Sequence, residues 1–140
     1  MQIFVNDNVV VGILILILGF IFHFLGQLIS LINWEYAKKI GLQDKKNLPE
    51  YDIYERAIAF ADVLIGWTYG IAAIGLIVNL SWGYTLAWIP GVVFIYHALF
   101  FWVMKGNQNK SGNQISSNGF RITWFLMNFI TGILAVLIAL

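Results

Sequence analysis

Four long runs of apolar residues, separated by shorter polar segments, make up most of the chain. A helix needs about 20 consecutive apolar residues to cross the hydrocarbon core of a bilayer. The segments that meet this requirement are residues 9–32, 57–79, 84–104 and 120–140. This pattern predicts an all-α, polytopic membrane protein: a bundle of four transmembrane helices in a single domain that covers residues 1–140.

The three connections between these runs differ in character. Residues 33–56 hold ten of the fifteen charged residues, and Pro49 followed by Glu50 and Asp52 is typical of a helix start. Residues 80–84 predict a tight hairpin. Residues 105–119 are polar and rich in glycine, so we expect a mobile loop there.

The basic residues predict the orientation of the bundle. All eight fall in or beside the first and third connections: Lys38, Lys39, Lys45, Lys46, Arg56, Lys105, Lys110 and Arg121. Short loops rich in lysine and arginine remain in the cytoplasm. Residues 33–56 and 105–119 are therefore predicted to be cytoplasmic, with both termini on the outer side. The predicted location is an integral, multi-pass position in the cell membrane, which in a bacterium is the inner membrane.

Composition narrows the class of protein further. The chain is 60% hydrophobic and only 11% charged, far from the roughly 25% charged residues of a soluble domain. It has no cysteine, which excludes disulfides and thiolate chemistry. A net charge of +1 gives no reason to expect nucleic acid. The start, MQIFVNDN, lacks the basic region of a signal peptide, so the first apolar run is predicted to be retained.

Each predicted helix carries a polar residue at a similar depth. His23 and Gln27 lie near the cytoplasmic end of the first helix, and Asp62, His97 and Asn128 lie in the second, third and fourth. A rise of about 1.5 Å per residue places these groups in the cytoplasmic half of the bilayer. Because ionisable residues inside a membrane are costly, they mark candidate functional sites.

These polar residues share helix faces with small residues. At 100° per residue, Gly19 lies on the face of His23, while Gly66 and Tyr69 lie on the face of Asp62. Small residues allow membrane helices to pack closely, so these faces should form the bundle interior. Phe60 and similar large residues should face lipid. In the third helix, Pro90 should bend the helix.

The first functional hypothesis is a polar, protonatable pocket in the cytoplasmic half of the bundle that binds or transports a small solute or ion. Its candidate ligand-binding or proton-handling residues are His23, Gln27, Asp62, Tyr69, His97 and Asn128, with Glu55 and Arg121 at the cytoplasmic mouth. A histidine near a carboxylate titrates close to neutral pH, as a proton relay requires. A full transport path would need more than four short helices, so a homo-oligomer or a membrane-protein partner is expected.

Two alternatives remain open beside this hypothesis. One is a membrane enzyme or redox subunit that binds a metal, haem or a quinone-like ligand through His23 and His97. A divalent metal would use His23, Asp62 and His97, and haem b would use both histidines. No local spacing such as H-x-x-x-H supports a metal, so no cofactor is predicted. The other alternative is an accessory subunit whose polar core only holds the helices together.

Overall fold

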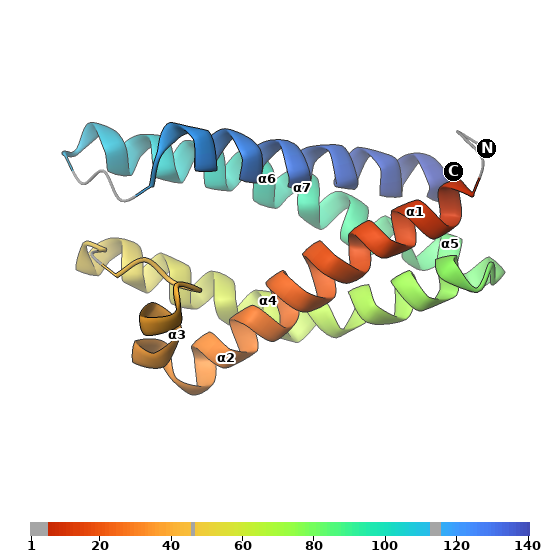
Figure 1. The fold of residues 1–140 in the computed structure, drawn as a ribbon, viewed down its shortest axis with the longest axis horizontal. Helices are drawn as coiled ribbons and strands as arrows, with labels where there is room; N and C mark the ends of the chain where they lie inside the picture. The colour runs from red at the N-terminus through yellow and green to blue at the C-terminus, as the bar shows by residue number, and fades with distance from the viewer. Residues whose placement is uncertain (1–5, 46, 113–115) are drawn as a thin grey trace.

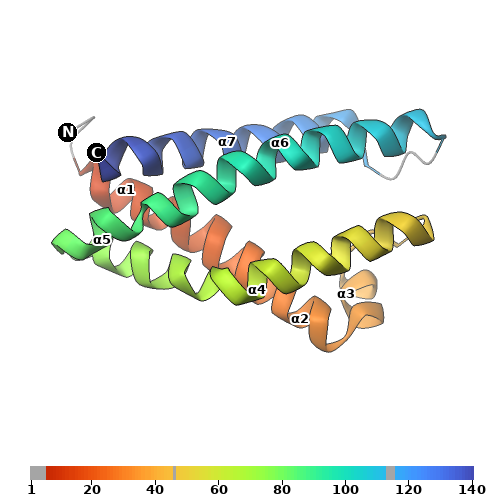
Figure 2. The same cartoon turned by 180° about the vertical axis from the view of Figure 1, so that it is seen from behind.

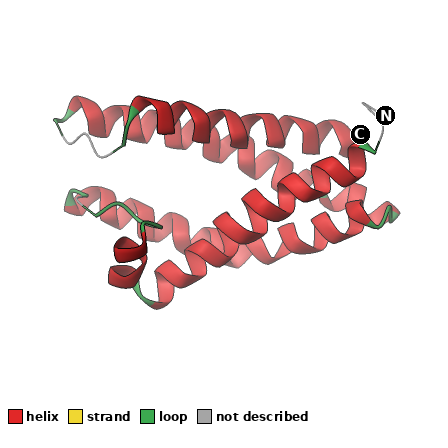
Figure 3. Cartoon of the chain, viewed as in Figure 1, coloured by secondary structure: helices red, strands yellow, loops and turns green. Residues whose placement is uncertain are grey.

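The computed structural model describes residues 6–45, 47–112 and 116–140, and all regular secondary structure in these residues is helical (Figure 3). Four helices are long and apolar enough to span a membrane: Asp7–Ile32, Pro49–Ile77, Ser81–Lys110 and Asn118–Ala139. The prediction of an all-α protein is therefore confirmed, and its four long helices could span a membrane by length and composition. The elements are α1 (Asp7–Leu14), η1 (Ile15–Gly26), α2 (Gln27–Ile32), α3 (Trp34–Ile40), α4 (Pro49–Ile77), α5 (Ser81–Leu86), α6 (Trp88–Lys110) and α7 (Asn118–Ala139).

The helix boundaries follow local sequence signals. Helix α4 begins at Pro49, as predicted, with Glu50 and Asp52 in its first turn. Within the predicted loop 33–56, α3 is capped by the Asn33 side chain and ends at Gly41, whose φ of 86° favours glycine. The predicted loop 105–119 is shorter than expected, because α6 continues to Lys110. Residue 46 and residues 113–115 lie outside the described residues.

Two of the four candidate membrane-spanning helices depart from regular α-geometry. The middle of the first, η1, is a π-helix, a wider form that the sequence analysis did not predict. π-Helical turns are rare and occur frequently at functional sites, and η1 carries His23. In the third, the α-helix is interrupted at Ala87, three residues before Pro90. A proline has no N–H to bond the carbonyl four residues earlier, which accounts for this break.

The helices form two pairs that diverge from one end of the molecule to the other. Helices α6 and α7 run side by side, while the α1–η1–α2 helix crosses α4 (Figures 1 and 2). The start of α1, the end of α7 and α5 lie at one end, which we call the terminal end (Figure 1). Helix α3, the end of α6 and the start of α7 lie at the opposite end, which we call the loop end. The basic residues in α3, the start of α4, the last turns of α6 and the start of α7 gather toward the loop end.

The small residues pack where the helices meet, as predicted. A Cβ on Gly19 would lie 2.8 Å from Phe94, and one on Gly66 would lie 2.8 Å from Phe24. Phe60, expected to face lipid, is 58% exposed. On the terminal side of the polar residues, the interior is an apolar core of Val11, Ile15, Leu18, Tyr69, Ala73, Leu76, Ala87, Phe94, Ala135 and Ile138.

Candidate functional site

Four of the five polar residues predicted at a similar depth, all except Gln27, meet in the interior of the bundle. His23 Nδ1 lies 3.4 Å from Asp62 Oδ2, and His23 Nε2 donates to Asn128 Oδ1 at 2.8 Å. The three residues come from η1, α4 and α7, and all of them are buried. We call these residues, together with His97 of α6, the histidine–aspartate cluster. The expectation that Asp62 faces the other helices rather than lipid is confirmed.

The hydrogen bonds of Asn128 fix the role of each nitrogen in His23. Asn128 Nδ2 donates to the backbone carbonyl of Trp124 at 2.9 Å, so the amide oxygen is the atom that faces His23. A carbonyl oxygen only accepts, so His23 Nε2 must carry the proton. In a neutral ring, Nδ1 then presents its lone pair to the Asp62 carboxylate.

His97 completes the cluster from the opposite helix pair. Its ring centre lies 4.3 Å from that of His23, and the two rings are perpendicular, at 89°. The indole Nε1 of Trp124 donates a long hydrogen bond to His97 Nε2 at 3.5 Å. Phe94 stacks on His23 with ring centres 5.3 Å apart. The two imidazoles are thus held together by aromatic neighbours.

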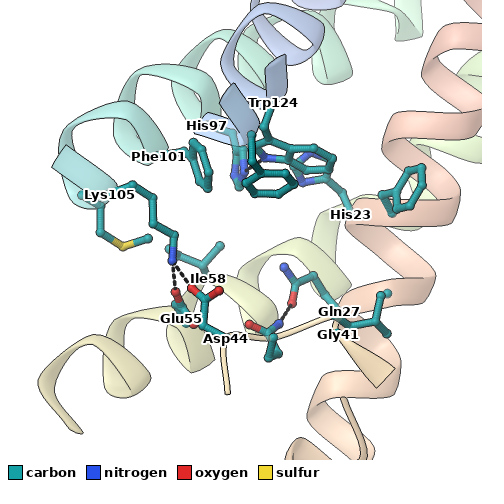
Figure 4. Close-up of a pocket in the computed structure, with 16 residues that line it drawn as sticks. His23, Gln27, Gly41, Asp44, Glu55, Ile58, His97, Phe101, Lys105 and Trp124 are labelled. Atoms are coloured by element: carbon teal, nitrogen blue, oxygen red, sulfur yellow. Dashed lines mark hydrogen bonds and ion pairs between the residues drawn. The ribbon is translucent and has the colours of Figure 1, made fainter. Parts of the chain in front are cut away.

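A pocket of about 270 Å³ separates the histidine–aspartate cluster from the surface at the loop end. His23 and His97 form part of its wall, and Glu55 and Lys105 lie on its opposite side (Figure 4). Much of the remaining wall is aromatic. The full lining is Phe22, His23, Gly26, Gln27, Gly41, Leu42, Gln43, Asp44, Glu55, Ile58, His97, Phe101, Met104, Lys105, Phe120 and Trp124.

Two carboxylates and one lysine meet at the mouth of this pocket. Lys105 Nζ donates to Glu55 Oε1 at 2.8 Å and also pairs with Asp44 (Figure 4). Glu55 and Lys105 are 8% and 5% exposed, and burial of such charges is tolerated only when they are paired. The second oxygen of Glu55, Oε2, is buried without a hydrogen-bond partner among the described residues. The triad therefore places two carboxylates and a single lysine in the pocket wall.

The segment between α3 and α4 crosses the pocket mouth and is anchored on both sides. Gln43 Nε2 donates to Gln27 Oε1 at 2.8 Å, which ties the segment to α2. Asp44 ties it to Lys105 of α6. Farther along, Asn47 Oδ1 accepts from Gln108 Nε2 at 2.8 Å. These side chains hold the segment as a strap over the loop end.

The remaining predicted site residues lie elsewhere. Tyr69 packs edge-on against Phe94 in the apolar core, with ring centres 5.4 Å apart. Its hydroxyl is buried without a hydrogen-bond partner in the described part of the chain. Arg121 was expected beside Glu55, but its guanidinium lies 3.8 Å from the ring centre of Trp102. It lines a separate hollow of about 440 Å³ with Gly106. Glu55 pairs instead with Lys105 of α6.

Sequence reasoning missed three polar residues of the pocket wall: Lys105, Asp44 and Gln43. Lys105 directly follows a predicted span, a position where a lysine is usual. Nothing in the sequence indicates that it pairs with Glu55, fifty positions earlier. Gln27, by contrast, was predicted and lines the pocket. The one available signal for Lys105 was its place directly after the apolar run, one turn beyond Phe101.

The sequence analysis considered two cofactors for the histidine–aspartate cluster, haem b and a divalent metal ion, and the geometry treats them differently. Haem ligated by both histidines must place its macrocycle between the imidazoles. Rings in direct contact at 4.3 Å leave no room for it, so the arrangement does not fit haem b. A single metal ion needs far less space. Ligand atoms of His23, Asp62 and His97 all lie within 4.8 Å of one another.

Comparison with protein-family models, with curated proteins and with solved structures finds no match. The fold therefore defines the protein only as a helical chain with four candidate membrane spans and a buried histidine–aspartate cluster.

Proposed function

We propose that this membrane protein binds a small organic amine in the pocket at its loop end. The observation that carries the proposal is the triad of Glu55, Asp44 and Lys105, in which two carboxylates share one lysine in the wall of a cavity that also has four Phe and Trp side chains. A ligand amine would pair with the carboxylates of this triad. Its apolar body would lie against Phe22, Phe101 and Trp124.

The charges at the mouth favour a cationic ligand. Lys105 is the single basic residue among the pocket-lining residues, and it is shared by the two carboxylates of Glu55 and Asp44. The ionised triad would carry one negative charge in excess. Aromatic faces add a further attraction for a cation, worth about 0.5–2 kcal/mol depending on desolvation. The polar groups of Gln27 and Gln43 could fix the orientation of the ligand.

The pocket volume limits the size of the ligand. Pockets for drug-sized molecules usually enclose about 300–1,000 Å³, and this one encloses about 270 Å³. A single ring or a short branched chain that carries one amine is therefore the appropriate size.

Binding explains the pocket better than conduction through one copy of the chain does. The pocket wall reaches His23 and His97, and the apolar core fills the bundle from Phe94 to the terminal end. A polar solute would have to cross Leu18, Leu76 and Ile138 without a hydrogen-bonding partner. Transport would need a large rearrangement or a second copy of the chain.

Single cysteines can test this proposal, because the natural chain has none. Ile58→Cys places a thiol in the pocket wall. Leu64→Cys is a matched control on the same helix, where the side chain is 60% exposed but expected to face lipid. A small, water-soluble thiosulfonate should label Ile58→Cys rapidly and Leu64→Cys slowly, since the reagent reacts with the thiolate in water.

Benzylamine is the ligand probe, and benzyl alcohol is its neutral counterpart. Benzylamine should slow the labelling of Ile58→Cys, while benzyl alcohol at equal concentration should have little effect. Glu55→Gln in the same background should remove the protection. Equal labelling of the two cysteines would refute the pocket. Protection by both probes, or protection that survives Glu55→Gln, would refute the proposed recognition of an amine.

A further inference from the structure

The separation of His23 from Asp62 is unusual for a histidine–carboxylate pair. A charge-assisted hydrogen bond between nitrogen and a carboxylate oxygen measures about 2.7–2.9 Å. His23 Nδ1 and Asp62 Oδ2 are 3.4 Å apart, although both side chains are buried and tightly packed. With its proton held on Nε2 by Asn128, a neutral His23 presents a lone pair to this carboxylate. Two acceptors that face each other repel unless a positive charge lies between them.

The observed separation fits two ligands of one metal ion. Bonds of about 2.0–2.1 Å to nitrogen and oxygen in a tetrahedral zinc site place neighbouring ligand atoms about 3.4 Å apart. His23 Nδ1 and Asp62 Oδ2 already have this spacing. An ion placed between them would satisfy the lone pair and the carboxylate together.

His97 can supply the third ligand. Its ligand atom is within 4.8 Å of those of His23 and Asp62, so a shift of about 1.5 Å would bring it to tetrahedral spacing. The side chain is only partly buried and borders the pocket, which leaves room for a rotation. Two imidazoles and one carboxylate form a ligand set that suits zinc and similar divalent transition metals.

The surroundings of the cluster also match those of a metal site. A metal-binding histidine usually donates its second ring N–H to a carbonyl or carboxylate, which fixes its tautomer. Asn128 Oδ1 accepts that hydrogen bond from His23 at 2.8 Å. Because His23 and His97 line the pocket while Asp62 lies behind them, a fourth coordination position would face the cavity.

We infer that His23, Asp62 and His97 form a binding site for a single divalent transition-metal ion such as Zn²⁺, with Asn128 orienting His23 and one coordination position open to the pocket. This inference does not rest on amine binding. The amine would be held at the mouth by Glu55, whereas the ion would lie at the opposite side of the pocket (Figure 4).

Co²⁺ is a suitable spectroscopic probe, because tetrahedral Co²⁺ absorbs visible light much more strongly than octahedral Co²⁺. The experiment uses the full chain in detergent, free of any histidine tag, since the only histidines are then His23 and His97. Titration should produce strong visible bands that saturate at one ion per chain and disappear when Zn²⁺ displaces Co²⁺.

Variants assign the ligands. His97→Gln and Asp62→Asn should each abolish the tetrahedral spectrum, and Asn128→Leu should weaken affinity by about 10- to 100-fold, as loss of an outer partner does. Glu35→Gln, which removes an exposed acid on α3, should leave binding unchanged. Elution and thermal unfolding without metal establish that each variant is folded.

Two results would overturn the inference. One is a wild-type protein that gives only the weak octahedral spectrum, which would leave His23 and Asp62 as an imidazolium–carboxylate pair. The other is a tetrahedral spectrum that persists in His97→Gln or Asp62→Asn. Neither result would alter benzylamine protection of Ile58→Cys, so this inference and amine binding can fail separately.

Discussion

The contact between α4 and α5 at the terminal end offers a quantitative test of the packing. A Cβ added to Gly83 would lie 2.3 Å from the carbonyl carbon of Gly75 and 2.5 Å from the backbone nitrogen of Leu76. Both neighbours are backbone atoms, which cannot rotate away. Gly26 is the matched control, because it is also a buried helical glycine. There the nearest atoms are 3.7 Å away, at ordinary contact distance.

The expected stabilities follow from two opposing terms. Glycine to alanine in a helix gains about 1 kcal/mol from helix propensity at either position. Overpacking costs about 1–3 kcal/mol, and a rigid backbone neighbour places Gly83→Ala at the upper limit. Gly83→Ala should therefore lose about 2 kcal/mol, and Gly26→Ala should gain up to about 1 kcal/mol, a difference of about 3 kcal/mol.

Reversible unfolding in mixed micelles, followed by circular dichroism as the fraction of denaturing detergent rises, measures this difference directly. Both variants should show the helical content of the wild type before the transition, so that only the free energy of unfolding changes. If Gly83→Ala were as stable as Gly26→Ala, α4 and α5 could not approach as closely as described.

Two further predictions concern the ion pairs at the pocket mouth and the orientation of the bundle in the membrane. Lys105→Met should lower the free energy of unfolding by about 3–5 kcal/mol, because it leaves Glu55 buried without its partner, and adding Glu55→Gln should recover part of that loss. A loss in Lys105→Met below about 1 kcal/mol, typical of an exposed pair, would contradict the buried triad. Single cysteines at Asn109 and Ser81 should react with an impermeant reagent from opposite sides of the membrane, with Asn109 reached from the cytoplasm. Labelling of both from one side would refute the predicted orientation.

The sequence predicted the faces of the helices because helical periodicity and residue size are local properties. In α4, Ala59, Asp62, Gly66 and Tyr69 are all buried, as the 100° repeat required. Membrane helices also leave little freedom in depth, since each must span the same hydrocarbon layer. Because His23, Asp62 and Asn128 share a depth and each lies on the interior face of its helix, their contact could be predicted.

The parts that could not be predicted depend on pairings between distant segments. The bond from Lys105 to Glu55 joins residues fifty positions apart, and the crossing of the strap depends on where α3 places Gln43. Neither contact leaves a periodic pattern in the sequence. The close approach of Gly75 to Gly83 was also hidden, because the residues around it predicted a simple hairpin rather than a new helix at Ser81. In these cases tertiary packing, rather than local pattern, decides the contact.

The surroundings of the histidine–aspartate cluster differ in polarity between the loop end and the terminal end of the bundle. Toward the loop end, His23 and His97 border a pocket with polar side chains at its mouth. Toward the terminal end, Phe94 stacks on His23, and beyond it lies the apolar core, with the buried Thr131 side chain and the Tyr69 hydroxyl as polar groups on that side. Among the described residues, the pocket therefore brings solvent close to the cluster through His23 and His97. Under the two proposals made above, an amine and a metal ion would both enter and leave the protein through the pocket at the loop end.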